Sequence, residues 1–357
     1  MQTGKSPGDE LLEEPPVPPT GFYELIDRSM HGVYAVSAIR AAILLGVFDR
    51  PDAVIDPDRS SPALGIAPGP LRDLCESLCS IGLLSREGSG YRVDPVAATY
   101  LTAGSPYRQA RYLEKQFRHI TEFWLPLARL LREGPVVYNT AEFFAKESLE
   151  GMAENALTGR LQKTVAEIAA HPRFPGFRNM IDLGGGHGLY AIALCRANPA
   201  LEAVVMDLPG VVSFARGYIE TYRAERVRLL PGNFFTDDIG CCYDLVLSSS
   251  NPSGKSVEMI GRIAAALNPG GIFVNVQPES EVREDPFLRL ERQLWTLSGT
   301  EGEPGHGGRH LRDRPFMDSG YVEALNRNGL RVTRSTEIPD EYHPGYHVRL
   351  VIAEKEG

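Results

Sequence analysis

The sequence contains few cysteines, and none of them stands in a metal-binding pattern. Cys75 and Cys79 are four residues apart and Cys241 and Cys242 are adjacent. Neither pair is followed by a second pair or by histidines at zinc-site spacing. We therefore predict no metal site and no disulfide framework. We expect all five thiols to be reduced and buried, as is usual in the cytosol.

Long apolar runs are also missing. No uninterrupted apolar stretch reaches the length that a transmembrane helix needs. Residues 1–20 are rich in glutamate and proline, and they lack the basic start and the apolar run of a signal peptide. The sequence therefore predicts a disordered tail over residues 1–20, no membrane partner and a cytoplasmic location.

Positive charge is scarce. The whole chain has a net charge of −9, and residues 1–100 carry 8 basic and 14 acidic side chains. Binding to nucleic acid depends on cations that displace the counterions of the phosphates. We therefore predict no nucleic-acid partner, although residues 21–105 have the pattern of a fold that often reads DNA.

That pattern is a set of helices followed by a small hairpin. The expected elements are a helix at Phe22–Leu45, a turn-rich segment at Ser60–Ile66, a helix at Leu71–Ile81 and strands at Leu83–Ser85 and Tyr91–Val93. Gly46 and Gly82 end the two helices. The order predicts a winged-helix domain over residues 21–105, and its acidic charge favours contact with protein over contact with DNA.

Residues 106–170 predict a second helical region, with helices at Arg111–Glu133 and Leu149–Ala169 and a Pro/Gly break between them. From residue 171 onward strands and helices alternate. The expected strands are Asn179–Leu183, Leu201–Met206, Val227–Leu230, Tyr243–Leu247, Gly271–Val276, Leu330–Ser335 and His347–Ala353. The expected helices are Leu189–Ala197, Val211–Tyr222, Ser256–Leu267 and Phe316–Asn328. This alternation predicts an α/β, Rossmann-like domain with a mostly parallel sheet covered on both faces.

The first strand of this domain runs into a glycine turn. Asp182 lies in an apolar strand, Gly184, Gly186 and Gly188 follow it, and a helix begins at Leu189. Glycines permit a tight turn that brings the backbone close to a ligand, and the helix points its N-terminus at the same place. The turn therefore predicts a ligand site at the carboxyl end of the first strand.

Two carboxylates indicate which ligand fits. Asp207 ends the next strand, where an acidic residue can accept both ribose hydroxyls of an adenosine. The fingerprint of NAD would place its third glycine at residue 189, where this chain has leucine. Asp182, just inside the turn, suits a ligand with an ammonium group better than one with a pyrophosphate. We therefore predict S-adenosylmethionine (SAM) as the cofactor and reject NAD.

These residues resemble a known family. Over nearly its whole length after the tail, the chain is similar to the two-domain SAM-dependent O-methyltransferases that modify small molecules in plants and in bacterial secondary metabolism. The stretches that carry the resemblance are Ala41–Asp49, Leu78–Leu84, the glycine turn, Met206–Val212, Gly232–Phe235 and Leu267–Gly271. The resemblance implies a class I methyltransferase domain at 171–357, a helical linker and substrate region at 106–170, and a winged-helix dimerisation domain at 21–105 that makes a homodimer.

The resemblance also assigns the cofactor residues. The three glycines would line the methionine and the ribose, and Asp207 with Leu208 would hold the ribose and the adenine. Asn233 and Phe234 match the pair that contacts adenine, although the family usually has aspartate at the first of these positions. The asparagine keeps a carbonyl acceptor for the adenine amino group. The predicted cofactor residues are Asp182, Gly184, Gly186, Gly188, Asp207, Leu208, Asn233, Phe234 and Ser248.

One feature of the family is missing. Members that methylate phenols usually carry a catalytic histidine just after the fourth strand, and this chain has no histidine between His187 and His306. The segment 251–256 ends in Gly-Lys-Ser, but Ser249 stands where a phosphate-binding loop has its first glycine, so we reject a nucleotide triphosphatase. The candidate replacement bases are His119, His306 and His310, because histidine titrates in the required range.

The predicted substrate contacts are Phe123, Trp124, Phe144, Met152 and Trp295. Their aromatic character favours a flat, apolar or aromatic substrate. The sequence thus predicts methyl transfer to a small aromatic or polycyclic metabolite, with oxygen as the preferred acceptor. Three explanations of the missing histidine stay open: an ionised or carbon nucleophile, a different base, or a SAM-binding protein of the same fold that performs non-methyl chemistry such as cyclisation or hydroxylation.

Overall fold

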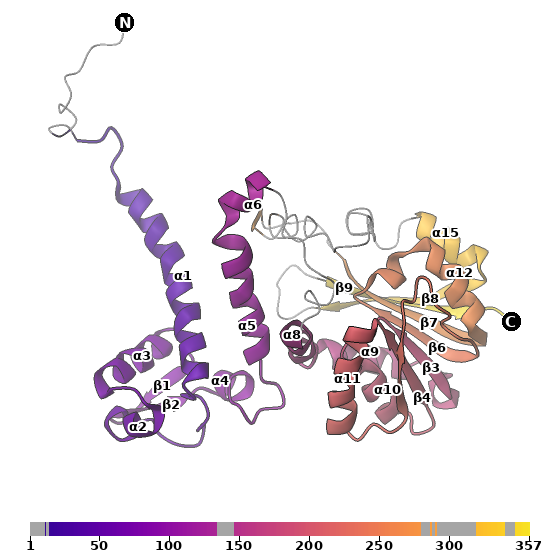
Figure 1. Ribbon diagram of the computed structural model, residues 1–357, viewed down its shortest axis with the longest axis horizontal. Helices are drawn as coiled ribbons and strands as arrows, with labels where there is room; N and C mark the ends of the chain where they lie inside the picture. Colours follow the sequence, from indigo (N-terminus) through magenta and orange to yellow (C-terminus); the bar gives the residue numbers. More distant parts are fainter. Residues whose placement is uncertain are drawn as a thin grey trace, which may run out of the picture. The chain divides into compact units, whose positions relative to one another are not determined.

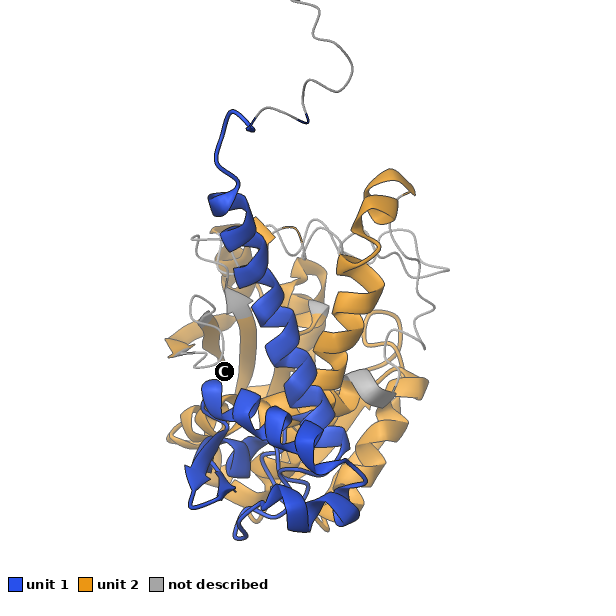
Figure 2. Ribbon diagram, turned by 90° about the vertical axis from the view of Figure 1, so that its left-hand side faces the viewer, with its two compact units in different colours: residues 1–110 blue, residues 111–357 orange. Residues whose placement is uncertain are grey.

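The computed structural model describes residues 11, 14–133, 146–279, 286–287, 290, 319–339 and 347–357. The chain forms two compact units, Met1–Ala110 and Arg111–Gly357, coloured blue and orange in Figure 2. The predicted division into a tail, a winged helix, a linker and a catalytic domain stays a prediction. Most of the predicted tail lies outside the described residues.

The first unit contains four helices and one hairpin within its described residues. Its elements are α1 (Thr20–Leu44), α2 (Pro57–Leu64), α3 (Pro68–Ser80), β1 (Leu84–Glu87), β2 (Gly90–Val93) and α4 (Pro95–Tyr100). The predicted hairpin is confirmed, since β1 pairs with β2 in an antiparallel register. Phe48, Leu71 and Leu78 are fully buried and form part of its core.

The prediction that Ser60–Ile66 is a turn-rich segment is wrong, because α2 covers most of it. The side chain of Asp56 accepts hydrogen bonds from the main-chain N–H groups of the first turn, and a proline occupies the first helical position. Gly65 ends the helix in the left-handed conformation, with φ of +66°. The same Asp-Pro start occurs at Asp94, which begins α4. An Asp-Pro pair is therefore the helix signal that the sequence analysis missed.

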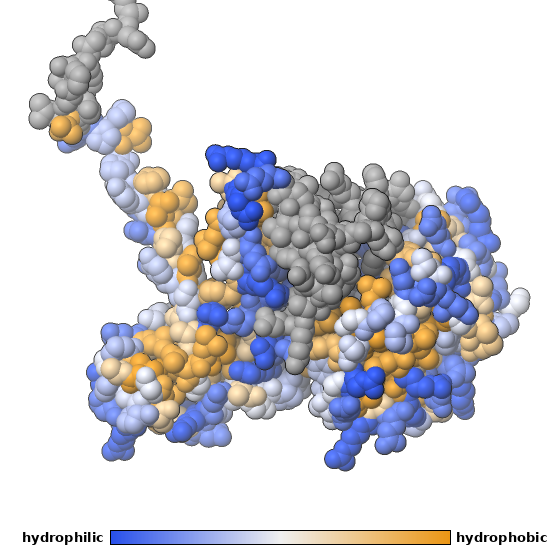
Figure 3. All heavy atoms as spheres, in the orientation of Figure 1, coloured by the Kyte–Doolittle hydropathy of each residue, from blue (hydrophilic) through white to orange (hydrophobic). Residues whose placement is uncertain are grey.

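Helix α1 is 25 residues long, yet only Ala42 is buried. The large apolar side chains that it exposes are Phe22, Tyr23, Leu25, Ile26, Met30, Val33, Tyr34 and Leu44. Hydrophobic side chains are visible along this helix in Figure 3. A monomeric protein rarely exposes so many apolar residues together, and a surface of this kind marks a contact site.

The second unit begins with helices that precede its sheet. They are α5 (Ala110–His119), the π-helical turn η2 (Ile120–Trp124), α6 (Leu127–Glu133), α8 (Lys146–Ala156) and α9 (Arg160–Ala169). The prediction of one helix over Leu149–Ala169 is wrong, because the chain leaves α8 after Ala156 and starts α9 at Arg160. Gly159 stands between them at φ of +131°, a conformation that favours glycine.

A seven-stranded sheet forms the centre of the second unit (Figure 1). Its strands are β3 (Asn179–Leu183), β4 (Glu202–Asp207), β5 (Val227–Pro231), β6 (Tyr243–Ser249), β7 (Leu267–Glu279), β8 (Leu330–Pro339) and β9 (His347–Lys355). They lie in the order β5-β4-β3-β6-β7-β9-β8. The first five are parallel, and β9 runs antiparallel to both β7 and β8. The predicted α/β fold with a mostly parallel sheet is confirmed.

Helices cover both faces of this sheet. The helices that follow strands are α10 (Leu189–Ala197), α11 (Pro209–Thr221), α12 (Val257–Ala266) and α15 (Ser319–Arg327). Met180 of β3 packs in one buried cluster with Leu194 of α10, whereas its neighbour Ile181 packs in the other cluster with Ile263 of α12. Successive strand residues point to opposite faces, so an apolar run such as 180–183 suits a strand that is buried on both sides.

Within the described part of the chain, no helix has both the length and the apolar character that crossing a bilayer requires.

The expectation that all thiols are buried is wrong for Cys241 and Cys242. These two cysteines are exposed in the turn before β6, whereas Cys75 and Cys195 are buried. This turn lies at the surface because it connects elements, as turns generally do.

Candidate functional site

The candidate site lies at the carboxyl edge of the parallel strands. Strand β3 pairs with β4 on one side and with β6 on the other, so the order in which the chain adds strands to the sheet reverses at β3. Ligands of open α/β sheets bind in the crevice outside such a point. The segments that leave β3, β4, β5 and β6 at this edge are therefore the ones that build the site.

The segment after β3 is the glycine turn. Gly184, Gly186 and Gly188 have φ of +65°, +53° and +73°, so each adopts a left-handed conformation that a side chain would strain. The N–H of Gly184 donates to the carbonyl of Met206 at 2.8 Å, which ties the turn to β4. Gly188 then begins α10. The glycines are required by the backbone path, as the sequence predicts.

The turn is packed on one side and open on the other. A methyl group at Gly184 would lie 2.9 Å from Nδ2 of Asn251 and 3.2 Å from the ring of Phe234. A methyl group at Gly185 would lie 2.7 Å from a carboxylate oxygen of Asp182. At Gly186 a methyl group would meet no atom within 4 Å. Gly186 therefore borders space that a ligand can use.

Asp182 is buried at the floor of this turn. The residue is 1% exposed, and neither carboxylate oxygen has a hydrogen-bond partner among the described residues. Burial raises the pKa of this carboxyl to about 8, and the nearby charge of Asp207 adds to the shift. A buried carboxyl without a partner is costly, so its presence indicates that something outside the described chain completes it.

Asp207 ends β4 and holds the open side of the turn. One carboxylate oxygen accepts from the N–H of Gly186 at 2.9 Å, and the other accepts from the N–H of Leu208 at 2.8 Å. Burial raises the pKa of Asp207, and these two backbone hydrogen bonds oppose that rise. The structure thus brings Gly186, Asp207 and Leu208 together, as the sequence analysis expects.

His187 stands inside the turn without the properties of a base at neutral pH. Burial, together with the charge of Arg160, lowers the pKa of its imidazole to about 4. Its Nδ1 accepts from the N–H of Leu189 at 3.2 Å, and its ring stacks on Tyr190. This arrangement agrees with a structural role for His187.

The segment after β5 brings an aromatic ring to the turn. Asn233 uses its side-chain oxygen to accept from the N–H of Phe235 at 2.9 Å, so this oxygen shapes its own loop. The ring of Phe234 lies beside Gly184. Arg262 of α12 donates to the carbonyls of Phe234 and Phe235 and so fixes the loop.

The segment after β6, where the family carries its histidine, is a closed hydrogen-bonded network. The fully buried Ser248 donates to Oδ1 of Asn251 at 3.0 Å and lies 2.8 Å from the hydroxyl of Ser253. Asn275 of β7 and Tyr321 of α15 both donate to the carbonyl of Gly254, and Asn275 also donates to the Tyr321 hydroxyl at 2.6 Å. The Ser248 hydroxyl therefore serves this network, and its predicted contact with the cofactor stays a prediction.

The candidate bases and substrate residues are only partly described. His119 is buried at the end of α5, edge-on to Phe123 with ring centres 5.6 Å apart. Trp124 meets the ring of Phe287 at 6.2 Å. Met152 is half-buried in α8. The predicted residues that lie outside the described part of the chain are His306, His310, Phe144 and Trp295.

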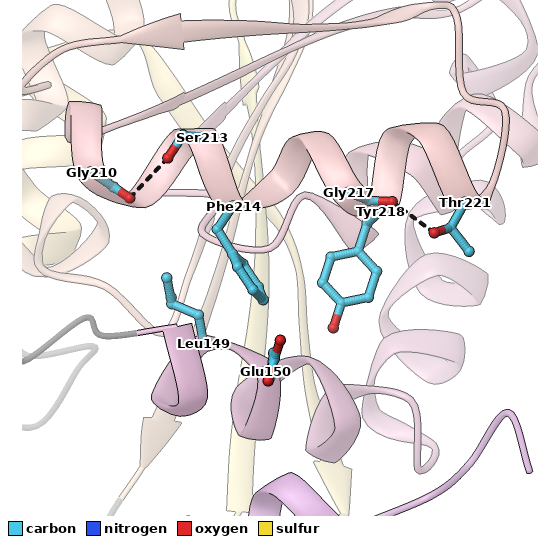
Figure 4. A pocket seen from close by; sticks show the side chains of 8 residues that line it. All are labelled: Leu149, Glu150, Gly210, Ser213, Phe214, Gly217, Tyr218 and Thr221. Atoms are coloured by element: carbon cyan, nitrogen blue, oxygen red, sulfur yellow. Dashed lines mark hydrogen bonds between the residues drawn. The ribbon is translucent and has the colours of Figure 1, made fainter. Parts of the chain in front are cut away.

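A separate cavity of about 590 Å³ lies between α8 and α11. Figure 4 shows Phe214 and Tyr218 pointing from α11 towards Leu149 and Glu150 on α8. Among the predicted site residues that the structure describes, none lines this cavity. Because it begins at Gly210, just beyond Asp207 and Leu208, it adjoins the segment after β4 without including the glycine turn.

Comparison with known proteins identifies the family of this chain. Residues 137–303 match the model of an O-methyltransferase domain. Acetylserotonin O-methyltransferase of Bos taurus is 30% identical over 304 residues, which cover 78% of this chain and 87% of the bovine protein. The chain belongs to the O-methyltransferase family. It is a methyltransferase whose cofactor is SAM, and both predictions are confirmed.

Two further relatives of this methyltransferase show how far the similarity extends. The 3-hydroxy-5-methyl-1-naphthoate 3-O-methyltransferase of Streptomyces sahachiroi is 29% identical over 296 residues, which cover 79% of this chain and 86% of that enzyme. The crystal structure of human N-acetylserotonin methyltransferase with SAM superposes with a TM-score of 0.66 at 22% identity, over 94% of this chain and 98% of the human chain. At that identity the superposition shows the fold alone.

Residues that the sequence analysis did not assign to the site are Asn251, Ser253, Asn275 and Tyr321. Asn251 and Ser253 lie in the segment that lacks the first glycine of a phosphate-binding loop, and the sequence pattern indicates no role for them. Asn275 and Tyr321 are 46 residues apart in the chain and meet through one hydrogen bond. Only the order of strands, with β7 beside β6, brings this bond into reach of Gly254.

Proposed function

We propose that this methyltransferase transfers a methyl group to oxygen of a small aromatic or polycyclic metabolite, without a base in the segment after β6. The closed network there carries the proposal. Its polar side chains bond to one another, and between Ser249 and Ser256 it offers no histidine or carboxylate that could take a proton. The aromatic substrates named for the naphthoate and acetylserotonin relatives support the substrate class.

The described residues suit SAM. The ammonium of the ligand would complete the buried Asp182 carboxylate, and the open space at Gly186 would accept its methionine and ribose. Asp207 would hold the ribose, with Leu208, Asn233 and Phe234 around the adenine. When bound, SAM supplies a methyl group that its sulfonium already activates. The protein's own part is then to hold the acceptor atom in line and exclude water.

The acidity of the acceptor decides how much a base matters. A phenol with a pKa near 10 is mostly neutral at pH 7, and a positioned general base typically adds about 10² to 10⁴-fold. Without that base in the segment after β6, the acceptor must be ionised already, or His119, His306 or His310 must take the proton. The second candidate is methyl transfer to carbon, or non-methyl chemistry on the same fold. The absence of a histidine or carboxylate base from the segment after β6 favours this candidate.

The test uses labelled SAM and a panel of phenols and quinols of graded pKa. If the substrate brings its own negative charge, the pH at which kcat/KM rises will move with the phenol's pKa. A rise at one fixed pH for every phenol, lost in one of His119→Ala, His306→Ala or His310→Ala, would identify that histidine as the base. Label bonded to a ring carbon would shift the function to the carbon acceptor, and no labelled product across the panel, despite SAM binding, would shift it to non-methyl chemistry.

We further propose that the first unit is a winged-helix module that joins two copies of the chain. The exposed apolar side chains of α1 support this role, because a second copy would cover them. Replacing Phe22, Ile26 and Val33 together by glutamate should convert a dimer into a monomer in light scattering. Glu24, Asp27 and Arg28 on the same exposed helix allow a matched alanine control, which should stay dimeric. A wild-type protein that is monomeric at all concentrations would refute the proposal.

A further inference from the structure

One side chain joins the segment after β6 to the glycine turn. Nδ2 of Asn251 donates to the carbonyl of Leu183 at 2.6 Å and, more weakly, to that of Ser249 at 3.3 Å. Leu183 is the last residue of β3, so its carbonyl belongs to the peptide that opens the turn. Asn251, in the segment after β6, is thus bonded to the main chain of the predicted SAM site.

The other end of the same amide is held by the network. Oδ1 of Asn251 accepts from the Ser248 hydroxyl at 3.0 Å and from the N–H of Ser253 at 3.0 Å, and the Ser253 hydroxyl also donates to it. Its main-chain carbonyl accepts from Nε2 of Gln277 at 3.0 Å. These bonds leave the side chain one orientation.

The position requires this residue type. One amide supplies a donor for the Leu183 carbonyl and an acceptor for Ser248 and Ser253 within a single planar group. Aspartate would place an oxygen against the Leu183 carbonyl, and alanine would remove one of that carbonyl's donors. The amide also stands against Gly184, where a methyl group would approach Nδ2 to 2.9 Å. Contact on this face confines the start of the turn to its observed path.

We infer that Asn251 is a positioning residue for the cofactor, because it fixes the Leu183–Gly184 peptide and thereby the shape of the turn that receives SAM. The inference rests on the proposed role of the glycine turn in SAM binding. On this inference, the segment after β6 holds the cofactor site in shape and does not move a proton. The measured effect should therefore fall on cofactor affinity.

The experiment compares Asn251→Asp and Asn251→Ala with Tyr321→Phe. The hydroxyl of Tyr321 shares the network but bonds to Gly254 and Asn275 rather than to Asn251, so it controls for loss of stability. We expect both Asn251 variants to raise the Kd of SAM by about tenfold, the effect of removing one hydrogen-bond donor from a buried carbonyl. Tyr321→Phe should raise the Kd by less than about threefold for the same fall in Tm, and in the Asn251 variants kcat at saturating SAM should change less than KM.

A second measurement keeps the inference testable if Asn251→Ala does not fold. Gly184→Ala should weaken SAM binding partly by pushing its methyl against Asn251. In the Asn251→Ser background the shorter side chain no longer reaches this methyl group, so this part is reduced and the two changes should be less than additive in a double-mutant cycle. Additive effects, or Asn251 variants that bind SAM as tightly as wild type, would overturn the inference. Wild-type protein that does not bind SAM would instead refute the proposed function.

Discussion

Two segments leave neighbouring strands at the same edge of the sheet, and they are built in opposite ways. The turn after β3 consists of glycines, borders open space at Gly186 and leaves the carboxylate of Asp182 without a described partner. The segment after β6 is made of short polar side chains whose hydrogen bonds close on one another. The first segment leaves polar groups available to a ligand, whereas the second finds hydrogen-bond partners within the protein.

The difference separates the two roles that an active-site edge must fill. Unsatisfied groups around open space are available to a ligand, whereas satisfied groups in a packed network give rigidity. Substitutions in the turn should therefore change ligand binding more than stability. Substitutions in the segment after β6 should do the reverse, except at Asn251, which reaches into the turn.

The largest effect is expected for Gly186→Val. The side chain would enter the open space beside the turn, and its β-branch would be strained at φ of +53°. We expect the Kd of SAM to rise by at least about 100-fold, measured by calorimetry. Gly88→Val is the matched control, because Gly88 has φ of +60° and is equally open but lies in the β1–β2 turn of the first unit. Equal losses of affinity for SAM in Gly186→Val and Gly88→Val would show that the turn after β3 has no special role in ligand binding.

A smaller effect, on stability, is expected for Tyr321→Phe. The change removes a buried hydroxyl that bonds to Gly254 and Asn275, at a cost of about 1–2 kcal/mol. For a unit of this size the Tm should fall by roughly 2–6 °C in calorimetry. The affinity for SAM should stay within about threefold of wild type. Tyr107→Phe at an exposed position should change neither quantity, and a loss of affinity without a loss of Tm in Tyr321→Phe would contradict the assignment.

Asp182 should make both stability and ligand binding depend on pH. Its pKa of about 8 in the folded protein lies above the ordinary 3.8, so the folded state holds this proton more tightly than the unfolded state does. The contribution of this proton to the free energy of unfolding is fully present at low pH and is lost as the pH rises through the folded-state pKa of about 8. We expect the Tm of the ligand-free protein to fall from about pH 5 to pH 8, and to fall less in Asp182→Asn.

Ligand binding should show the opposite trend. A cationic ligand favours the ionised carboxylate, so the affinity of wild type for SAM should rise with pH over the same interval, by at most about tenfold per pH unit. Asp182→Asn cannot ionise and should bind SAM with an affinity independent of this titration. A wild-type affinity that is flat across this interval would show that Asp182 does not face the ligand's charge.

The sequence predicts correctly those parts of the fold that depend on residues close together in the chain. The bounds of β3 and α10 agree with the predicted ranges, because an apolar strand, a glycine turn and a helix follow one another directly. The sequence analysis does not predict helix α2, although Asp56 and Pro57 form a recognisable helix start. The network after β6 could not be predicted, because Asn275 and Tyr321 join it only through the order of strands in the sheet.

The site was predictable to the same extent. The residues of the turn and Asp207 follow from a local pattern, and the structure brings them together. Asn251 was visible only as part of a segment without a histidine. Its bond to Leu183 spans 68 residues, a separation that no local pattern reveals.

The place of β9 has a consequence for how the protein is made. This strand lies between β7 and β8, and in the described sheet β8 is joined to the other strands only through it. While the chain emerges from the ribosome, the edges of β7 and β8 therefore stay open until residues 347–355 have been synthesised. Open edges recruit other chains. A nascent or truncated chain that stops before β9 therefore leaves strand edges open to pairing with other chains.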